Sequence, residues 1–147
     1  MIYTELTRKA MKLAYDAHHG QLDKSGIPYI FHPFHLAEQM TDEYTTCAAL
    51  LHDVVEDTEV TMRELEEAFP PEVTEAVRLL THGKSTDYFD YVRKIGTNSI
   101  AKAVKLADLR HNSDTSRLCW TALADTAETA KRLEKYAEAI KLLTEGK

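Results

Sequence analysis

The densest group of chemically active side chains lies at residues 52–58, with the sequence HDVVEDT. It follows an apolar run (AALL) and therefore reads as the polar end of a buried helix. Residues four apart share a helix face, which places His52 below Glu56 and Asp53 below Asp57. Unpaired carboxylates this close would repel one another and be costly to bury. A divalent metal ion removes the conflict, because it takes deprotonated carboxylates and neutral imidazoles as ligands.

Two further candidate ligands come from distant parts of the chain. His32 opens a predicted helix, and Asp108 lies late in an apolar helical segment. With His52 and Asp53 they make a set of two imidazoles and two carboxylates. This set suits Mn²⁺, Fe²⁺, Co²⁺ or Ni²⁺, with Zn²⁺ also acceptable, and leaves positions open for water and substrate.

Spacing alone leaves a simpler reading open beside the metal site. In that reading Asp108 caps its helix or forms a salt bridge with Arg110 or Lys105, and His32 is a satisfied loop histidine. His35, three residues after His32, is either a hydrogen-bond partner of the ligand set or a surface histidine.

The elements that must position these residues are all predicted to be helical. Apolar residues recur at three- and four-residue spacing, and no alternating run of β-branched residues demands a sheet. The predicted class is therefore all-α. The expected helices cover residues 6–19, 32–40, 45–55, 61–69, 71–80, 88–95, 100–109 and 120–143.

Bulk properties restrict the function further. A chain of 147 residues is expected to form one domain, residues 1–147, and its net charge of −6 argues against nonspecific nucleic-acid binding. No leader pattern or bilayer-spanning apolar run is present, so a cytoplasmic location without membrane partners is expected. Cys47 and Cys119 are far apart and form no Cys-x-x-Cys pair, which favours two reduced packing cysteines over a zinc-thiolate site.

Several motifs taken together resemble the HD-domain hydrolase of the RelA/SpoT alarmone family. The similarity extends from about residue 14 to residue 112 and is carried by Gly20-Gln21, Lys24-Ser25-Gly26, Pro28-Tyr29-Ile30, His32-Pro33, residues 48–58, Lys105-Leu106-Ala107-Asp108 and His111-Asn112. The resemblance implies an all-helical HD-domain bundle that removes the 3′-pyrophosphate from ppGpp or pppGpp. Because the family's synthetase domain follows the hydrolase and this chain ends at Lys147, the chain is expected to be a stand-alone hydrolase of the small alarmone hydrolase type.

The same resemblance assigns roles to individual residues. It implies one Mn²⁺ held by His32, His52, Asp53 and Asp108. Glu56 and Asp57 match the acidic pair that orients and deprotonates water, and Lys24, Ser25 and Asn112 match nucleotide contacts. The residue types alone leave open that Glu56 and Asp57 form a solvated helix end, that Lys24 is a solvated lysine and that Asn112 only ends a helix.

The sequence departs from the family pattern where relatives bind substrate. Asp23 replaces the usual Arg, His82 replaces a Lys, Asp114 replaces an Arg, and Arg110 stands one residue later than usual. Acids in these places should repel a polyanion, unless they face away or pair with Lys24 or Arg110.

Two rival functions follow from these departures. One is an HD-domain phosphatase or pyrophosphatase for a different nucleotide, and the other is a non-catalytic module that binds a nucleotide. In each case the expected partner is a small nucleotide, and the oligomeric state is unknown.

Overall fold

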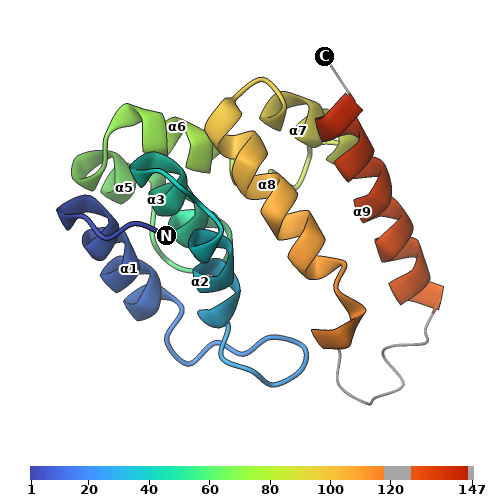
Figure 1. The fold of residues 1–147 in the computed structure, drawn as a ribbon, viewed down its shortest axis with the longest axis horizontal. Helices are drawn as coiled ribbons and strands as arrows, with labels where there is room; N and C mark the ends of the chain where they lie inside the picture. The colour runs from blue at the N-terminus through green and yellow to red at the C-terminus, as the bar shows by residue number, and fades with distance from the viewer. Residues whose placement is uncertain (118–126, 146–147) are drawn as a thin grey trace.

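The computed structural model describes residues 1–117 and 127–145, and this part of the chain contains helices and no strand (Figure 1). An isolated β-bridge joins Leu22 to Pro28. The all-α prediction is confirmed. The helices are α1 Glu5–Ala17, α2 Phe31–Glu38, α3 Glu43–Leu51, α4 Val54–Asp57, α5 Met62–Ala68, α6 Pro71–Leu80, α7 Tyr88–Ile95, α8 Ser99–Asn112 and α9 Ala127–Glu145, with a 3₁₀ turn at Thr115–Arg117.

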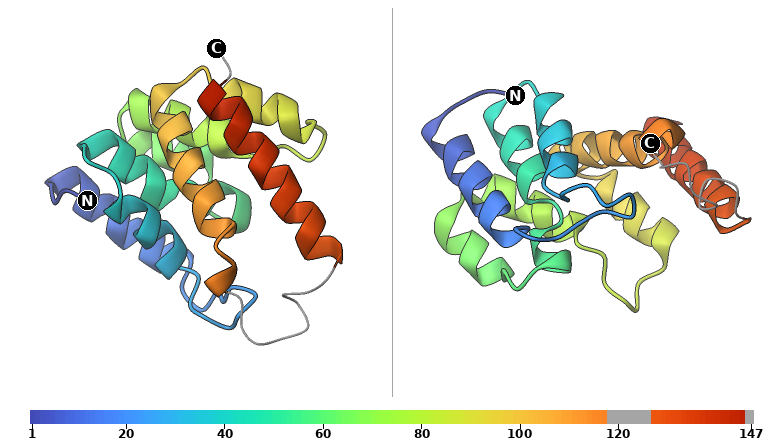
Figure 2. Two further views of the ribbon diagram at one scale, coloured as in Figure 1. Left: turned by 45° about the vertical axis from the view of Figure 1, so that its right-hand side comes forward. Right: turned by 90° about the horizontal axis from the view of Figure 1, so that it is seen from below.

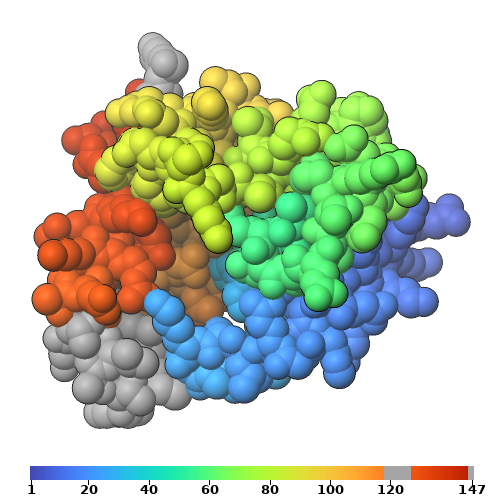
Figure 3. Space-filling model, turned by 180° about the vertical axis from the view of Figure 1, so that it is seen from behind, coloured from blue at the N-terminus to red at the C-terminus, as the bar shows by residue number. Residues whose placement is uncertain are grey.

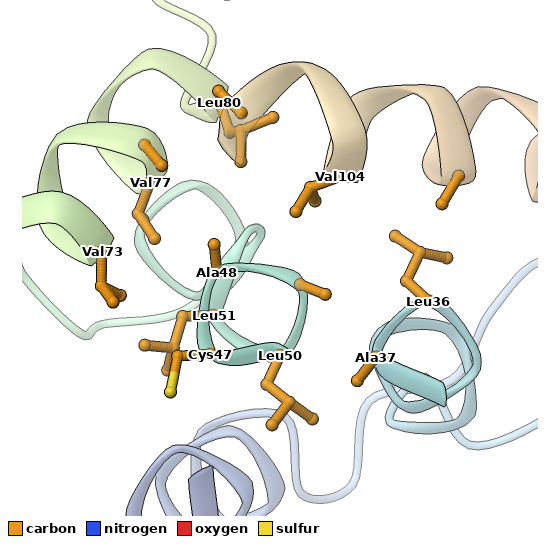
Figure 4. Close-up of a cluster of buried hydrophobic side chains, with 14 of the residues drawn as sticks. Leu36, Ala37, Cys47, Ala48, Leu50, Leu51, Val73, Val77, Leu80 and Val104 are labelled. Carbon is orange, nitrogen blue, oxygen red and sulfur yellow. The ribbon is translucent and has the colours of Figure 1, made fainter. Parts of the chain in front are cut away.

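Helix α3 is the centre of the bundle. Every residue from Thr45 to Leu51 is buried, and the helix packs against α1, α2, α6 and α8. Figure 4 shows side chains of α2, α6 and α8 gathered around it, among them Leu36, Val77 and Val104. A helix that is apolar on all sides is stable only inside the protein, so the polar residues that end α3 are carried into the interior with it.

The predicted helix over residues 45–55 is interrupted, which corrects the expectation of one continuous element. Helix α3 ends at Leu51, Asp53 has φ −110° and ψ 0°, and α4 begins at Val54. The imidazole Nδ1 of His52 lies 2.6 Å from the carbonyl oxygen of Ala49, which an uninterrupted helix would offer to the N–H of Asp53. The side chain therefore competes with the backbone and ends the helix. The N–H of Asp57 still donates to the carbonyl of Asp53 at 2.9 Å, so these two acids keep their predicted register.

The connection between α1 and α2 is held by local hydrogen bonds. Gly20 and Gly26 have φ of +84° and +80°, a left-handed conformation that favours glycine. The Oδ1 atom of Asp23 accepts hydrogen bonds from the backbone N–H groups of Ser25 (2.8 Å) and Ile27 (3.0 Å). These bonds form an Asx turn that fixes the conformation of the loop.

The remaining boundaries follow the sequence closely. The Thr61 side chain accepts the N–H of Glu64 at the start of α5, and Pro71 is the first residue of α6, where its missing N–H costs nothing. Helix α7 has the predicted bounds. Helix α8 extends three residues beyond the predicted end, so Asp108 and Asn112 share one helix.

The C-terminal helix α9 lies beside α8 and α7 (Figure 2). Its predicted beginning at residues 120–126 and Cys119 lie outside the described residues. Cys47 is buried, and burial together with Glu43 raises the pKa of its thiol to about 12, as expected of a packing cysteine. In the described part of the chain no helix combines the length and apolarity needed to cross a membrane. The expected cytoplasmic location stays a prediction.

Leu51→Ala should lower the free energy of unfolding by about 2–5 kcal/mol, since it leaves a cavity in the fully buried centre of α3. Leu22→Ala is the matched control, because Leu22 is 60% exposed and the same truncation there should change stability by less than about 0.5 kcal/mol. Urea denaturation of both variants measures the difference. Equal stability losses would mean that α3 is not the centre of the core.

Candidate metal centre and its two pockets

The four predicted ligands converge where α2, the α3–α4 junction and α8 meet. One ligand atom from each of His32, His52 and Asp53 lies within 4.8 Å of the others. The Oδ1 atom of Asp108 lies 2.9 Å from Nε2 of His32 and 3.7 Å from Nε2 of His52. The structure therefore brings together all four residues that the sequence singled out.

His52 gives the clearest evidence on which charge this cluster attracts. Its Nδ1 is occupied as donor to the Ala49 carbonyl, so its Nε2 carries the ring's lone pair when the ring is neutral. This Nε2 is buried and makes no hydrogen bond within the described residues, although it lies 2.9 Å from Oδ2 of Asp53. Burial lowers the pKa of His52, but the carboxylates of Asp53 and Asp108 outweigh it and raise the pKa well above its usual value. The site thus attracts positive charge.

Each carboxylate of the cluster has a partner that fixes its orientation. The Tyr29 hydroxyl donates to Oδ2 of Asp53. The ammonium of Lys105 lies 3.0 Å from Oδ2 of Asp108, and the Asn112 amide donates to Oδ1 of Asp108 at 3.0 Å. Burial raises the pKa of Asp108, but Lys105 and the two imidazoles hold it well below its usual value, so this acid is ionised. The salt bridge of the simpler reading, between Lys105 and Asp108, is present, and it lies within the cluster.

These residues fit a divalent metal ion. The donor set is two imidazoles and two ionised carboxylates, it is buried or half-buried, and it includes an orphaned Nε2. An ion among these atoms would satisfy the imidazole lone pairs and the carboxylates together.

An acidic pocket of about 200 Å³ opens beside this cluster. Of the described residues that line it, four carry carboxylates (Asp53, Glu56, Asp57 and Asp108) and one carries an ammonium (Lys105). Glu56 accepts the backbone N–H of His82 at 2.7 Å, which ties it to the α6–α7 loop. Partial burial and the nearby carboxylates of Asp53 and Glu56 raise the pKa of Asp57 to about 6. That carboxylate accepts a proton more readily than an ordinary aspartate does.

A second pocket of about 310 Å³ adjoins the first, because Tyr29 and Asn112 line both. It also contains Lys24 and Ser25, whose role as nucleotide contacts stays a prediction, and it adds Arg132 and Tyr136 from α9. Figure 3 shows a hollow on this face between α9, the α1–α2 loop and the α4–α7 side, with α8 at its floor. The second pocket joins cationic and aromatic groups to the acidic pocket, an arrangement suited to an anionic, ring-bearing ligand.

The acids that depart from the family pattern have structural partners. Asp23 organises its loop, and its Oδ2 lies 3.9 Å from Arg117, which was not among the partners considered from the sequence. The Oδ1 of Asp114 accepts the backbone N–H and the hydroxyl of Ser116. Both acids nevertheless line the second pocket.

Arg110 and His82 are the other two departures from the family pattern. Leu109 is fully buried, whereas Arg110 is exposed. The one-residue shift of the arginine relative to the family pattern therefore places the apolar side chain in the core. The ring of His82 stacks on Tyr91 at 4.5 Å, and its Nε2 donates to the carbonyl of Thr86. Neither Arg110 nor His82 lines the two pockets.

Sequence reasoning missed several residues around the site. Sequence reasoning gives Tyr29 no role and treats Lys105 only as a salt-bridge partner of Asp108 in the simpler reading. The position of Lys105, three residues before Asp108 on one helix face, is the signal that could have placed it at the site. The sequence signal for Arg132 and Tyr136 is weaker. They lie four residues apart on a long helix, and such pairs more often belong to the face that packs against the rest of the bundle. His35 is exposed and stacks on His111 at 4.1 Å, and it is His111 that contacts His32.

Comparison with known proteins gives a consistent result. The model of the HD domain family matches residues 10–111. A Spiroplasma citri protein named guanosine-3′,5′-bis(diphosphate) 3′-pyrophosphohydrolase is 39% identical over 127 residues, 74% of this chain and 16% of that protein. The Escherichia coli K12 bifunctional (p)ppGpp synthase/hydrolase SpoT is 38% identical over 123 residues, 74% of this chain and 18% of that protein. The chain thus spans less than a fifth of these relatives.

A solved structure covers nearly the whole chain. It is described as a metazoan ortholog of SpoT that hydrolyses ppGpp and plays a role in starvation responses. It superposes with a TM-score of 0.73 at 28% sequence identity, over 95% of this chain and 85% of the other.

Removing one carboxylate of the cluster should abolish metal binding. Protein prepared without chelator should carry one divalent ion per chain, and Asp53→Ala should carry none, because the neutral variant loses a ligand. Elemental analysis measures this directly. Saturating metal should also stabilise the wild type alone, by about 2.7 kcal/mol at a free concentration 100 times Kd.

Glu59→Ala is the matched control, an exposed acid outside the cluster whose loss should leave the metal content unchanged. Equal metal content in wild type and Asp53→Ala would show that the ion is held elsewhere.

Proposed function

The chain belongs to the HD domain family, and we propose that it is a metal-dependent hydrolase that removes the 3′-pyrophosphate from ppGpp and pppGpp. The observation that carries the proposal is the buried His32–His52–Asp53–Asp108 cluster, which opens into an acidic pocket that adjoins a cationic, aromatic one. The named activities of the relatives support the choice of substrate.

We assign Mn²⁺ to the centre, because a mixed set of two imidazoles and two carboxylates suits this ion. Fe²⁺, Co²⁺, Ni²⁺ and Zn²⁺ are the alternative ions. His32, His52, Asp53 and Asp108 would hold it. When bound, the ion would supply a Lewis acid that polarises phosphoryl oxygens and lowers the pKa of water.

The chain's own residues account for the remaining steps. Glu56 and Asp57 orient the attacking water and take its proton, the task for which the raised pKa of Asp57 is suited. The water oxygen bonds to the phosphorus on the ribose 3′-oxygen, the bond between that phosphorus and the 3′-oxygen breaks, and the 3′-oxygen takes a proton. The products are pyrophosphate and GDP, or GTP from pppGpp.

The second pocket is the proposed nucleotide site. Lys24 and Arg132 supply positive charge for phosphates, Tyr136 offers an aromatic face, and Ser25 and Asn112 offer hydrogen bonds. Asn112 also contacts Asp108, so one helix end links the nucleotide to the metal centre.

The proposal is tested by incubating Mn²⁺-loaded protein with ppGpp and separating the products by ion exchange. Pyrophosphate and GDP should appear in equal amounts, and chelator should stop the reaction. A panel of other nucleotides runs in parallel. Release of phosphate or pyrophosphate from another nucleotide, with none from ppGpp, would leave an HD-domain phosphohydrolase of different substrate. Binding without turnover of any member would favour the non-catalytic module.

Glu56→Gln should retain the metal and lose about 10²–10⁴-fold in kcat, the usual contribution of a general base. Glutamine keeps an oxygen that can accept the N–H of His82, so the substitution removes basicity and not the loop contact. Single-turnover kinetics measure the loss, and Glu59→Gln serves as control. A Glu56→Gln enzyme with near-normal kcat would remove Glu56 from the mechanism.

Asp23→Asn should lower KM for ppGpp by about two- to fivefold with kcat unchanged, since it removes a negative charge from the nucleotide pocket. Asparagine keeps the Oδ1 acceptor that organises the loop, which arginine would not. The difference should shrink at high ionic strength because added salt screens exposed charges. An unchanged KM at low salt would show that residue 23 does not act on the phosphates.

A further inference from the structure

A chain of three histidine rings runs from the metal centre to the surface. His32 and His111 have nearly parallel rings, 7° apart, with their Nδ1 atoms 2.7 Å from one another. The ring centroids are 5.0 Å apart, about the sum of two ring radii and this contact, so the two Nδ1 atoms point at each other along the ring planes. The ring of His35 stacks on the ring of His111, with the two ring centroids 4.1 Å apart.

The contact between His32 and His111 has a defined direction when His32 is a ligand. Two Nδ1 atoms at 2.7 Å share one proton, so one ring donates and the other accepts. An ion held by Nε2 of His32 requires the lone pair of that nitrogen, which puts the single proton of the neutral ring on Nδ1. His32 is then the donor and His111 the acceptor.

We infer that His111 is a positioning residue for the metal centre, which accepts the Nδ1–H of His32 and thereby directs the Nε2 lone pair of His32 into the centre. This inference rests on the proposed function only in taking His32 as a ligand. Asp108 and His111 are three residues apart on α8, so one face of a single helix presents both a ligand and the group that orients another ligand.

The other members of the cluster have partners of the same kind, which makes the role of His111 specific. The carbonyl of Ala49 fixes the ring of His52, the hydroxyl of Tyr29 fixes Asp53, and Lys105 fixes Asp108. Among the described residues His111 is the group that contacts the outward nitrogen of His32. Arg117 in turn donates to the backbone carbonyl of His111 at 2.8 Å and holds the end of α8 in place. Partners of this kind typically contribute about 10- to 100-fold to metal affinity.

The test compares three variants by titration with Mn²⁺ alone, without nucleotide. His111→Leu removes the acceptor and should weaken binding by about 10- to 100-fold. His111→Gln keeps an acceptor oxygen and should restore most of the affinity. His35→Leu removes the neighbouring ring, which makes no hydrogen bond to His32 in the described structure, and should bind as the wild type does.

The ring-nitrogen spectrum of His32 provides a signature that a merely structural role would not produce. In wild-type protein loaded with diamagnetic Zn²⁺, ¹⁵N–¹H correlation spectra should show Nδ1 protonated and Nε2 bound to metal. A bound or unprotonated Nδ1 would overturn the inference. So would a folded His111→Leu protein with wild-type Kd, and the wild-type spectrum decides the matter if that variant does not fold. Wild type that binds Mn²⁺ but leaves ppGpp intact contradicts the proposed substrate and leaves this inference standing.

Discussion

The structure depends on how four ionisable side chains are accommodated at one buried position. Two imidazoles and two carboxylates lie within a few ångströms of one another, at the end of a helix that is buried along its length. Ionised groups in such a place are costly unless they are paired and hydrogen-bonded. The partners supplied by Ala49, Tyr29 and Lys105 meet this requirement in part, and the orphaned Nε2 of His52 is the atom at which a bound cation would complete the pairing.

The rest of the bundle can be understood as the support for that point. Helix α3 is packed on every side, and the His52 ring ends it by taking the Ala49 carbonyl, so α4 begins as a separate turn. That turn carries Glu56 and Asp57 to the wall of the acidic pocket, while α8 brings Asp108 and Asn112 from the other side. The ligand cluster, the acids and the second pocket therefore occupy one junction of helices, where small changes in helix ends would alter all three.

Much of this could be read from the sequence. Apolar periodicity predicted the helices, with α7 at its observed bounds, and residue chemistry selected the four clustered side chains. The break after Leu51 could not be read, because it results from a side chain competing with the backbone for one carbonyl. The partners of Asp23 could not be read either. Its contacts with the backbone of its own loop and with Arg117, 94 positions away, depend on a turn and a tertiary contact that no helical periodicity encodes.

The most direct test of this account is anomalous diffraction from crystals of the Mn²⁺-loaded protein. The account predicts one manganese peak at coordination distance from Nε2 of His32, Nε2 of His52 and a carboxylate oxygen of each of Asp53 and Asp108. A protein that crystallises with Mn²⁺ but shows no peak there, or a peak held by other side chains, would contradict the central claim that this cluster is a metal centre.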